Sequence, residues 1–199
     1  MEVGILGGTF NPIHLGHLLI AEESRTALGL AAVVFAPAGQ PWMKLPEGLA
    51  PREDRWRMVE LATASNPHFR PSRVDLDRLG PSYAVDTVKD VRRLEPGVSP
   101  WFIMGVDAFE SLPQWRQPER LLGLCGLVVV ARPGHDTARA LAEVARLLPG
   151  VESQVRFVEG IHVDISATDI RRRCREGRSI KYRVPEAVES YILERGLYR

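Results

Sequence analysis

Six short apolar segments alternate with longer amphipathic segments along this chain, and that alternation constrains the fold more than any other feature. Segments of strand length separated by segments of helix length are typical of parallel strands joined by crossover helices. We therefore predict an α/β fold with a doubly wound, Rossmann-like and mainly parallel sheet that carries helices on both faces. The predicted strands cover residues 3–6, 33–36, 73–76, 101–104, 127–131 and 155–158.

Glycine and proline mark the ends of the predicted helices, as Gly29 does after the first helix and Pro51 before the second. The predicted helices cover residues 15–28, 52–65, 83–94, 137–148, 167–176 and 185–195. A chain of 199 residues is long enough for one domain over residues 1–199, with residues 160–199 as its small C-terminal helical part. Residues 37–54, rich in proline and glycine, are predicted to form a long loop that borders a site.

The charge of the chain is nearly balanced, with a formal net charge of +1. The chain therefore lacks the basic excess of a dedicated nucleic-acid binder, and no apolar run approaches the length of a membrane span. Cys125 and Cys174 lie far apart without metal-ligand spacing, so we expect two free thiols in a reducing compartment. The first residues are typical of a strand and not of a signal peptide, so we expect a cytoplasmic protein with no nucleic-acid and no membrane partner. The sequence is compatible with a homo-oligomer and does not fix the oligomeric state.

The segment GGTFNPIHLGH, residues 7–17, joins the first predicted strand to the first predicted helix. Its glycines permit close backbone approach, and Asn11-Pro12 turns the chain so that helix amides can bind phosphate. His14 and His17 lie one helical turn apart, so both imidazoles can donate to the same polyphosphate. In the alternative interpretation, His14 caps the turn and His17 is a partly buried helix residue. Neither GxxxxGK[ST] nor GxGxxG is present, which argues against kinase-type phosphoryl transfer and dinucleotide redox chemistry.

The same segment resembles the (T/S)FxPxHxGH signature of the nucleotidyltransferase superfamily, whose members bind a nucleoside triphosphate there and release pyrophosphate. ISATDIRRR, residues 165–173, resembles the second signature of that superfamily, ISxTxIR. Ser166 is a plausible N-cap for a helix that starts at Ala167, and Arg171 supplies a cation one turn further on. In the alternative interpretation, Ser166 only caps the helix and residues 171–173 form a solvated basic face.

The middle of the chain resembles one branch of the superfamily, the bacterial nicotinate-nucleotide adenylyltransferases. Four segments carry this resemblance, which covers essentially the whole chain: GPSYAVDTVKDVR, FIMGVDAFESLPQW, VVVARPG and VPEAVESYILERGLY. Pantetheine-phosphate adenylyltransferases share the first motif but are shorter and lack this middle set. The resemblance implies transfer of the adenylyl group of ATP to nicotinate mononucleotide, which gives deamido-NAD and pyrophosphate in NAD biosynthesis. It also implies Mg²⁺ bridging the phosphate oxygens of ATP, with no protein residue assigned to the metal.

The resemblance assigns roles to residues of this chain. It makes His14, His17 and Arg171 catalytic. The residues it implies for ATP binding are Gly8, Thr9, Phe10, His14, His17, Lys44, Gly105, Asp107, Ser166, Thr168 and Arg171. The residues it implies for nicotinate mononucleotide are Tyr83, Thr87, Trp115 and Arg132. The bland alternatives are a packing aromatic for Trp115, a solvated strand end for Arg132 and an exposed loop lysine for Lys44.

Two residues depart from the family pattern. Asn11 replaces a common aspartate, and we expect little loss because an amide can also make the turn. Ala84 replaces a threonine whose hydroxyl the family places near nicotinate, so recognition must depend on Tyr83, Thr87 or backbone amides. The alternatives are therefore an adenylyltransferase for nicotinamide mononucleotide or phosphopantetheine and, more distantly, a non-catalytic ATP-binding regulator.

Overall fold

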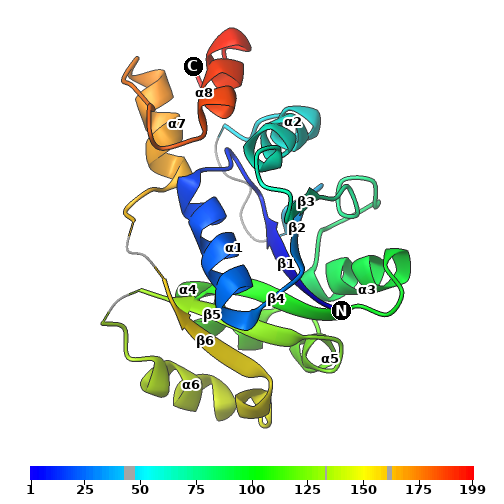
Figure 1. The fold of residues 1–199 in the computed structure, drawn as a ribbon. Helices are drawn as coiled ribbons and strands as arrows, with labels where there is room; N and C mark the ends of the chain where they lie inside the picture. Colours follow the sequence, from blue (N-terminus) through cyan, green and yellow to red (C-terminus); the bar gives the residue numbers. More distant parts are fainter. Residues whose placement is uncertain (43–47, 133, 161–162) are drawn as a thin grey trace.

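A six-stranded sheet, all parallel, forms the centre of the molecule in the computed structural model, which describes residues 1–42, 48–132, 134–160 and 163–199 (Figure 1). The strand order is β3-β2-β1-β4-β5-β6. Its members are β1 (Glu2–Gly8), β2 (Ala32–Pro37), β3 (Phe69–Pro71), β4 (Ser99–Gly105), β5 (Gly126–Ala131) and β6 (Val155–Glu159). The order confirms the predicted doubly wound α/β fold, and it reverses between β1 and β4, which pair in parallel.

Helices connect successive strands and then close the chain. They are α1 (Leu15–Leu28), α2 (Arg52–Thr63), α3 (Ala84–Leu94), α4 (Val106–Glu110), α5 (Pro118–Leu122), α6 (Thr137–Ala145), α7 (Ala167–Arg175) and α8 (Glu186–Glu194). Two 3₁₀ turns, η1 (Leu112–Gln114) and η2 (Val151–Ser153), complete the elements of the described residues. Among the described residues, no helix combines the length and the apolar character that a membrane crossing needs.

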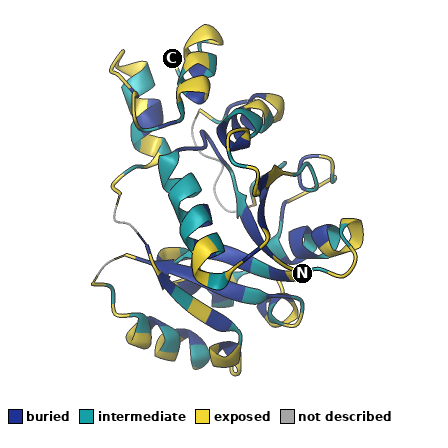
Figure 2. Ribbon diagram, viewed as in Figure 1, coloured by how far each residue is buried: buried dark blue, intermediate teal, exposed yellow. Residues whose placement is uncertain are grey.

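Successive residues of the central strands point into two separate cores, one on each face of the sheet. In β2, Val34 belongs to the core that also contains buried residues of α3, α4, α5 and α6. Val33 and Phe35 belong to the core that contains buried residues of α1, α2 and α8. The buried sheet between exposed outer helix faces is visible in Figure 2. Helices α7 and α8 reach the second core through Ile170 and Val188, so the C-terminal segment shares that core.

One predicted strand is wrong. Residues 73–76 form a turn, and the strand at this edge is β3, which pairs Phe69 with Val33 of β2. The Asp77 N–H donates to the Arg73 carbonyl oxygen at 2.9 Å, which closes the turn. The Asp75 carboxylate is buried and accepts from Arg78 and from Thr87 of α3, so these contacts hold the segment in a turn and not in a strand.

Candidate active site

Two pockets lie at the carboxyl ends of the strands, on either side of the β1 and β4 pair, where doubly wound sheets bind ligands. The histidine pocket, of about 230 Å³, is lined by His14, Gly16, Leu19, Ile20, Gly105, Val106, Asp107, Val130, Ala131, Arg132, Gly160, Val163 and Ile165. The tryptophan pocket, of about 190 Å³, is lined by Gly7, Gly8, Thr9, Ala38, Pro41, Trp42, Ser82, Ala84, Thr87, Phe102 and Trp115. The sheet therefore offers adjacent sites for two ligands.

The turn between β1 and α1 is held by buried hydrogen bonds of Asn11, and its Asn11-Pro12 peptide bond is cis. The Asn11 side-chain amide donates to the Gly48 carbonyl oxygen at 3.2 Å. Its Oδ1 accepts from the Ala50 N–H at 3.0 Å and from the Tyr198 hydroxyl at 2.9 Å. Asn11 therefore links the first motif to the segment before α2 and to the C-terminus.

The two histidines lie face to face at the start of α1. Their rings stack with centroids 3.7 Å apart, and the edge of the Phe10 ring meets His17 at 5.0 Å. The His14 N–H donates to His17 Nδ1 at 3.2 Å, which places the His17 proton on Nε2. His17 therefore keeps one N–H donor for a ligand.

Burial keeps both imidazoles neutral. It lowers the pKa of His14 from 6.5 to about 4. It also lowers the pKa of His17 well below 6.5, and the charge of a protonated His14 lowers it further. His14 is the N-cap of α1, and its Nδ1 is buried without a hydrogen-bond partner among the described residues. A buried nitrogen of this kind beside a pocket is available to a ligand.

The second motif begins helix α7 as predicted. Ser166 is the N-cap, and its Oγ accepts from the Asp169 N–H at 3.1 Å. Arg171 lies buried one turn later, where Nη2 donates to the Thr168 hydroxyl at 3.4 Å and Nη1 donates to the Asn11 carbonyl oxygen at 2.8 Å. The two motifs therefore meet, and the N-termini of α1 and α7, each the positive end of a helix dipole, lie at the same end of the sheet.

Charged residues that neighbour Arg171 on α7 form ion pairs with one another. Asp169 accepts from both Arg172 and Arg173. The backbone of α1 is anchored to the same C-terminal segment, because the Leu15 N–H donates to the Arg183 carbonyl oxygen at 3.0 Å. Figure 1 shows α7 and α8 at the end of the molecule where α1 begins.

Aromatic residues shape the tryptophan pocket. Trp115 is half-buried, meets Phe102 edge to face at 6.0 Å and donates from Nε1 to the Ser111 hydroxyl at 3.2 Å. Trp115 therefore both packs and lines the pocket. Trp42 also lines this pocket, and the centroid of its ring lies 5.7 Å from that of the Tyr83 ring. Flat aromatic faces of this kind suit a pyridine ring.

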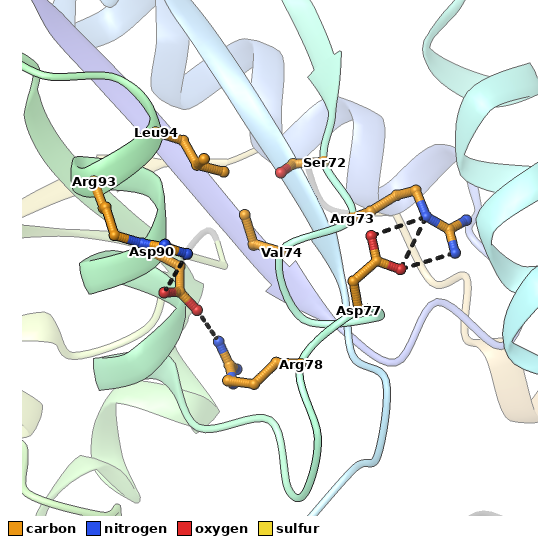
Figure 3. A pocket seen from close by; sticks show the side chains of 8 residues that line it. All are labelled: Ser72, Arg73, Val74, Asp77, Arg78, Asp90, Arg93 and Leu94. Carbon is orange, nitrogen blue, oxygen red and sulfur yellow. Dashed lines mark hydrogen bonds and ion pairs between the residues drawn. The ribbon is translucent and has the colours of Figure 1, made fainter.

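The hydroxyl of Thr87 lines the same pocket but is committed to a buried carboxylate. It lies 2.8 Å from both oxygens of Asp75, which also accepts from Arg78 at 2.5 Å. Burial raises the pKa of Asp75, and the Arg78 charge opposes that shift. Arg78 also donates to Asp90, at 2.6 Å. Both residues line a separate hollow of about 400 Å³ between α3 and residues 72–78 (Figure 3).

The structure gives the surroundings of four further predicted site residues, which are Arg132, Asp107, Phe10 and Gly105. Arg132 donates to Asp107 at 3.1 Å, and both residues line the histidine pocket. Trp115 lines the tryptophan pocket, so Trp115 and Arg132, both assigned to the mononucleotide by the resemblance, lie in different pockets. Phe10 is buried, so its side chain supports His17. Gly105, as the N-cap of α4, also lines the histidine pocket, whereas Lys44 lies outside the described residues.

Sequence reasoning missed three residues of the site. Trp42 and Ser82 line the tryptophan pocket. Arg55 is fully buried and donates to two residues that line the same pocket, through the carbonyl oxygens of Thr9 and Ala38. It also donates to the carbonyl oxygens of Gly39 and Ala50. An aromatic residue in a proline-rich loop could have indicated Trp42. Nothing in the local pattern separates Arg55 from the neighbouring arginines on α2.

A search for metal ligands gives no cluster: no group of three or more histidine, cysteine, aspartate or glutamate side chains could hold a metal ion in the described ranges. Asp107 is a carboxylate on the lining of the histidine pocket, and it is largely exposed. The donor set fits a cation that is held mainly by ligand oxygens and water, as Mg²⁺ is when it accompanies a nucleotide.

The family model described as cytidylyltransferase-like matches residues 5–173, so the fold and the site define a nucleotidyltransferase. "Probable nicotinate-nucleotide adenylyltransferase" of Thermus thermophilus is 47% identical over 199 residues, covering 100% of both chains. The protein of the same name from Saccharopolyspora erythraea is 44% identical over 198 residues, covering 100% of this chain and 90% of that protein. This chain belongs to the family of nicotinate-nucleotide adenylyltransferases.

A solved structure has the same fold as this chain. Plasmodium falciparum nicotinic acid mononucleotide adenylyltransferase, solved in complex with NaAD, superposes with a TM-score of 0.77. The alignment covers 99% of this chain and 97% of that chain. Because the two sequences are only 16% identical, the likeness concerns the fold alone.

Proposed function

We propose that this protein transfers the adenylyl group of ATP to nicotinate mononucleotide, giving deamido-NAD and pyrophosphate in NAD biosynthesis. The observation that carries the proposal is the hydrogen bond from Arg171 to the Asn11 carbonyl oxygen. It joins the two nucleotidyltransferase motifs at the carboxyl ends of the strands, where the histidine pocket and the tryptophan pocket both lie. Relatives at 44–47% identity that carry this family's name support the choice of acceptor.

The histidine pocket holds ATP in this proposal. The N-termini of α1 and α7 direct backbone N–H groups toward the triphosphate, and His17 Nε2–H adds a neutral donor. Arg171 is the fixed cation that stabilises the charge of the departing pyrophosphate. Of the residues named for ATP from the resemblance, His14, Gly105 and Asp107 line this pocket, whereas Gly8 and Thr9 line the neighbouring tryptophan pocket. The full proposed set is Gly8, Thr9, Phe10, His14, His17, Lys44, Gly105, Asp107, Ser166, Thr168 and Arg171.

The tryptophan pocket holds the acceptor, with Trp115 against the pyridine ring. Thr87 lines this pocket, and the ring of Tyr83 meets the lining residue Trp42. We propose both for the acceptor, and we keep Arg132 as a candidate for the mononucleotide phosphate. An oxygen of that phosphate attacks the α-phosphorus of ATP, the new P–O bond forms, and the bond to the β-phosphate breaks. Because the attacking oxygen is already ionised at neutral pH, the chain needs no general base. Catalysis then consists of in-line alignment and charge stabilisation.

Mg²⁺ belongs to this proposal as the ion that accompanies ATP and neutralises its phosphate charge. Asp107 is the carboxylate of the histidine pocket that could contact it, either directly or through water. We also propose that the protein works in the cytoplasm, because both Cys125 and Cys174 are free thiols. A measurement of the molecular mass in solution would show whether the protein forms a homo-oligomer.

Pyrophosphate release from ATP tests the proposal, with nicotinate mononucleotide, nicotinamide mononucleotide and phosphopantetheine as parallel acceptors. We expect the highest kcat/KM with nicotinate mononucleotide. A preference for either other acceptor would make the protein a different adenylyltransferase. ATP binding without product from any acceptor would identify a non-catalytic ATP-binding regulator.

A further inference from the structure

The tryptophan pocket provides few hydroxyl protons for a carboxylate. Ala84 brings a methyl group to the lining, and the Thr87 hydroxyl donates to Asp75. Ser82 Oγ accepts the Gly39 N–H at 3.0 Å, so its own proton is one neutral donor, and Thr9 brings a second neutral hydroxyl to the lining. The Asp75 carboxylate that accepts from Thr87 also forms an ion pair with Arg78, which offsets its negative charge. Hydroxyl groups therefore give little preference for an anionic ring substituent over a neutral amide.

Arg116 carries a positive charge next in sequence to a residue that lines this pocket. It directly follows Trp115, and its guanidinium carbon lies 4.9 Å from the centre of the Tyr83 ring. Tyr83 in turn contacts Trp42, and both Trp42 and Trp115 line the pocket. Arg116 is exposed and forms no ion pair with a carboxylate in the described part of the chain.

We propose that the Arg116 guanidinium binds the carboxylate of the nicotinate ring and thereby makes this enzyme prefer the acid over the amide. The Tyr83 ring holds the guanidinium by a cation–π contact, which reduces the entropy lost when a ligand binds. A guanidinium binds a carboxylate through charge-assisted hydrogen bonds, whereas a neutral amide offers it no charge. Arg116 thus replaces the donor that Ala84 cannot provide. This inference rests on the proposed function, because it takes nicotinate mononucleotide as the acceptor.

The test compares kcat/KM for nicotinate mononucleotide and nicotinamide mononucleotide in the wild type, Arg116→Gln and Arg116→Lys. Because one charge-assisted contact is lost, we expect Arg116→Gln to lower the acid-to-amide ratio about tenfold or more. The KM for ATP and kcat/KM for nicotinamide mononucleotide should stay within about twofold. Arg116→Lys should retain part of the ratio because it keeps the charge. Arg120→Gln, an exposed neighbour on α5, is the matched control and should keep the wild-type ratio.

A second variant makes the test reciprocal. Ala84→Thr adds a hydroxyl to the same lining, so in the Arg116→Gln background it should recover part of the preference for the acid. An unchanged ratio in Arg116→Gln, or an equal loss with both acceptors, would overturn the role of Arg116.

Direct binding separates this inference from the proposed function. Quenching of tryptophan fluorescence gives the Kd of each mononucleotide without turnover. If the wild type binds the acid more tightly and Arg116→Gln abolishes that difference, the inference holds even where no pyrophosphate is released. If the wild type turns over the acid but its Kd ratio does not depend on Arg116, the proposed function holds and the inference fails.

Discussion

Arg171 donates from Nη1 to the backbone carbonyl oxygen of Asn11, 2.8 Å away, across 160 residues of sequence. The same guanidinium donates from Nη2 to the Thr168 hydroxyl, and both of these acceptors are uncharged oxygens. Arg171 is buried, so its position is set by the folded chain before a ligand arrives. A fixed charge in a site with little water stabilises a developing anion without reorganisation during the reaction.

We expect Arg171→Met to lower kcat for adenylyl transfer by about 10²–10³, the usual effect of removing one preorganised donor. Arg171→Lys should retain more activity because it keeps the charge, but one ammonium group cannot reproduce the planar fork that reaches Asn11 and Thr168. Steady-state kinetics with varied ATP measure the effect. Arg172→Met is the matched control, because Arg172 is exposed and paired with Asp169. Equal losses in both variants would contradict a specific role for Arg171.

We expect the two ring nitrogens of His17 to have different functions, and two substitutions test them separately. Asparagine reproduces the acceptor near Nδ1 that receives the His14 N–H, whereas glutamine places an amide N–H near Nε2. We expect His17→Asn to keep the stability of the start of α1 and to lower kcat about 100-fold or more. His17→Gln should retain more of kcat because it keeps the donor. Thermal unfolding and kinetics of both variants measure the two effects.

The opposite order of activities, with the asparagine variant faster, would show that the Nε2 donor is not used. His68→Asn is the control for histidine removal, because His68 is exposed and its Nδ1 lies 3.2 Å from the Ala31 carbonyl oxygen, outside both pockets.

Much of this site could be predicted because its motifs coincide with local structure. Helix α1 has the predicted bounds, and Ser166 caps α7 as the serine in the second motif indicates. The wrong strand at residues 73–76 has a nonlocal cause, because the Asp75 carboxylate is satisfied by Thr87 from another element. Arg55 and Trp42 were missed for the same reason. Arg55 donates to carbonyl oxygens after β1 and β2, and Trp42 meets the Tyr83 ring before α3, so both depend on contacts that a single segment does not record.

The neutral state of His14 makes stability depend on pH. Its pKa is about 4 in the folded protein and near 6.5 in the unfolded chain, so between these values the unfolded chain binds more protons. The contribution of neutral His14 is therefore present above pH 6.5 and is lost as the pH falls toward 4. The full loss is about 3 kcal/mol.

Urea unfolding of the wild type and His14→Asn at pH 7, 6 and 5 measures this dependence. Asparagine keeps a good N-cap and does not titrate, so the free energy of unfolding of the variant should fall less steeply with acidity. Burial raises the pKa of Asp75, which acts in the opposite direction, but that group is present in both proteins and cancels in the difference. Parallel pH profiles would contradict the assignment of a buried neutral imidazole.

Arg55 should affect the acceptor more than ATP. Its Nη1 donates to Thr9 O at 2.9 Å and to Ala38 O at 2.6 Å, and both residues line the tryptophan pocket. Its other donors reach Gly39 O and Ala50 O, each at 3.2 Å, so one buried side chain connects the ends of β1 and β2 with the start of α2. We expect Arg55→Met to lower the free energy of unfolding by about 3 kcal/mol, since buried carbonyl groups lose a charged donor.

The kinetic consequence distinguishes positioning from general instability. Arg55→Met should raise the KM for nicotinate mononucleotide at least about fivefold at a temperature where the variant is folded, while the KM for ATP changes less than twofold. Arg55→Lys keeps the charge but reaches fewer carbonyl oxygens, so it should give intermediate values of both stability and acceptor KM. Thr63→Val on the same helix removes a buried hydroxyl far from the pocket and supplies a destabilised reference. If that reference raises the acceptor KM as much as Arg55→Met does, the effect comes from lost stability, and Arg55 does not position the pocket.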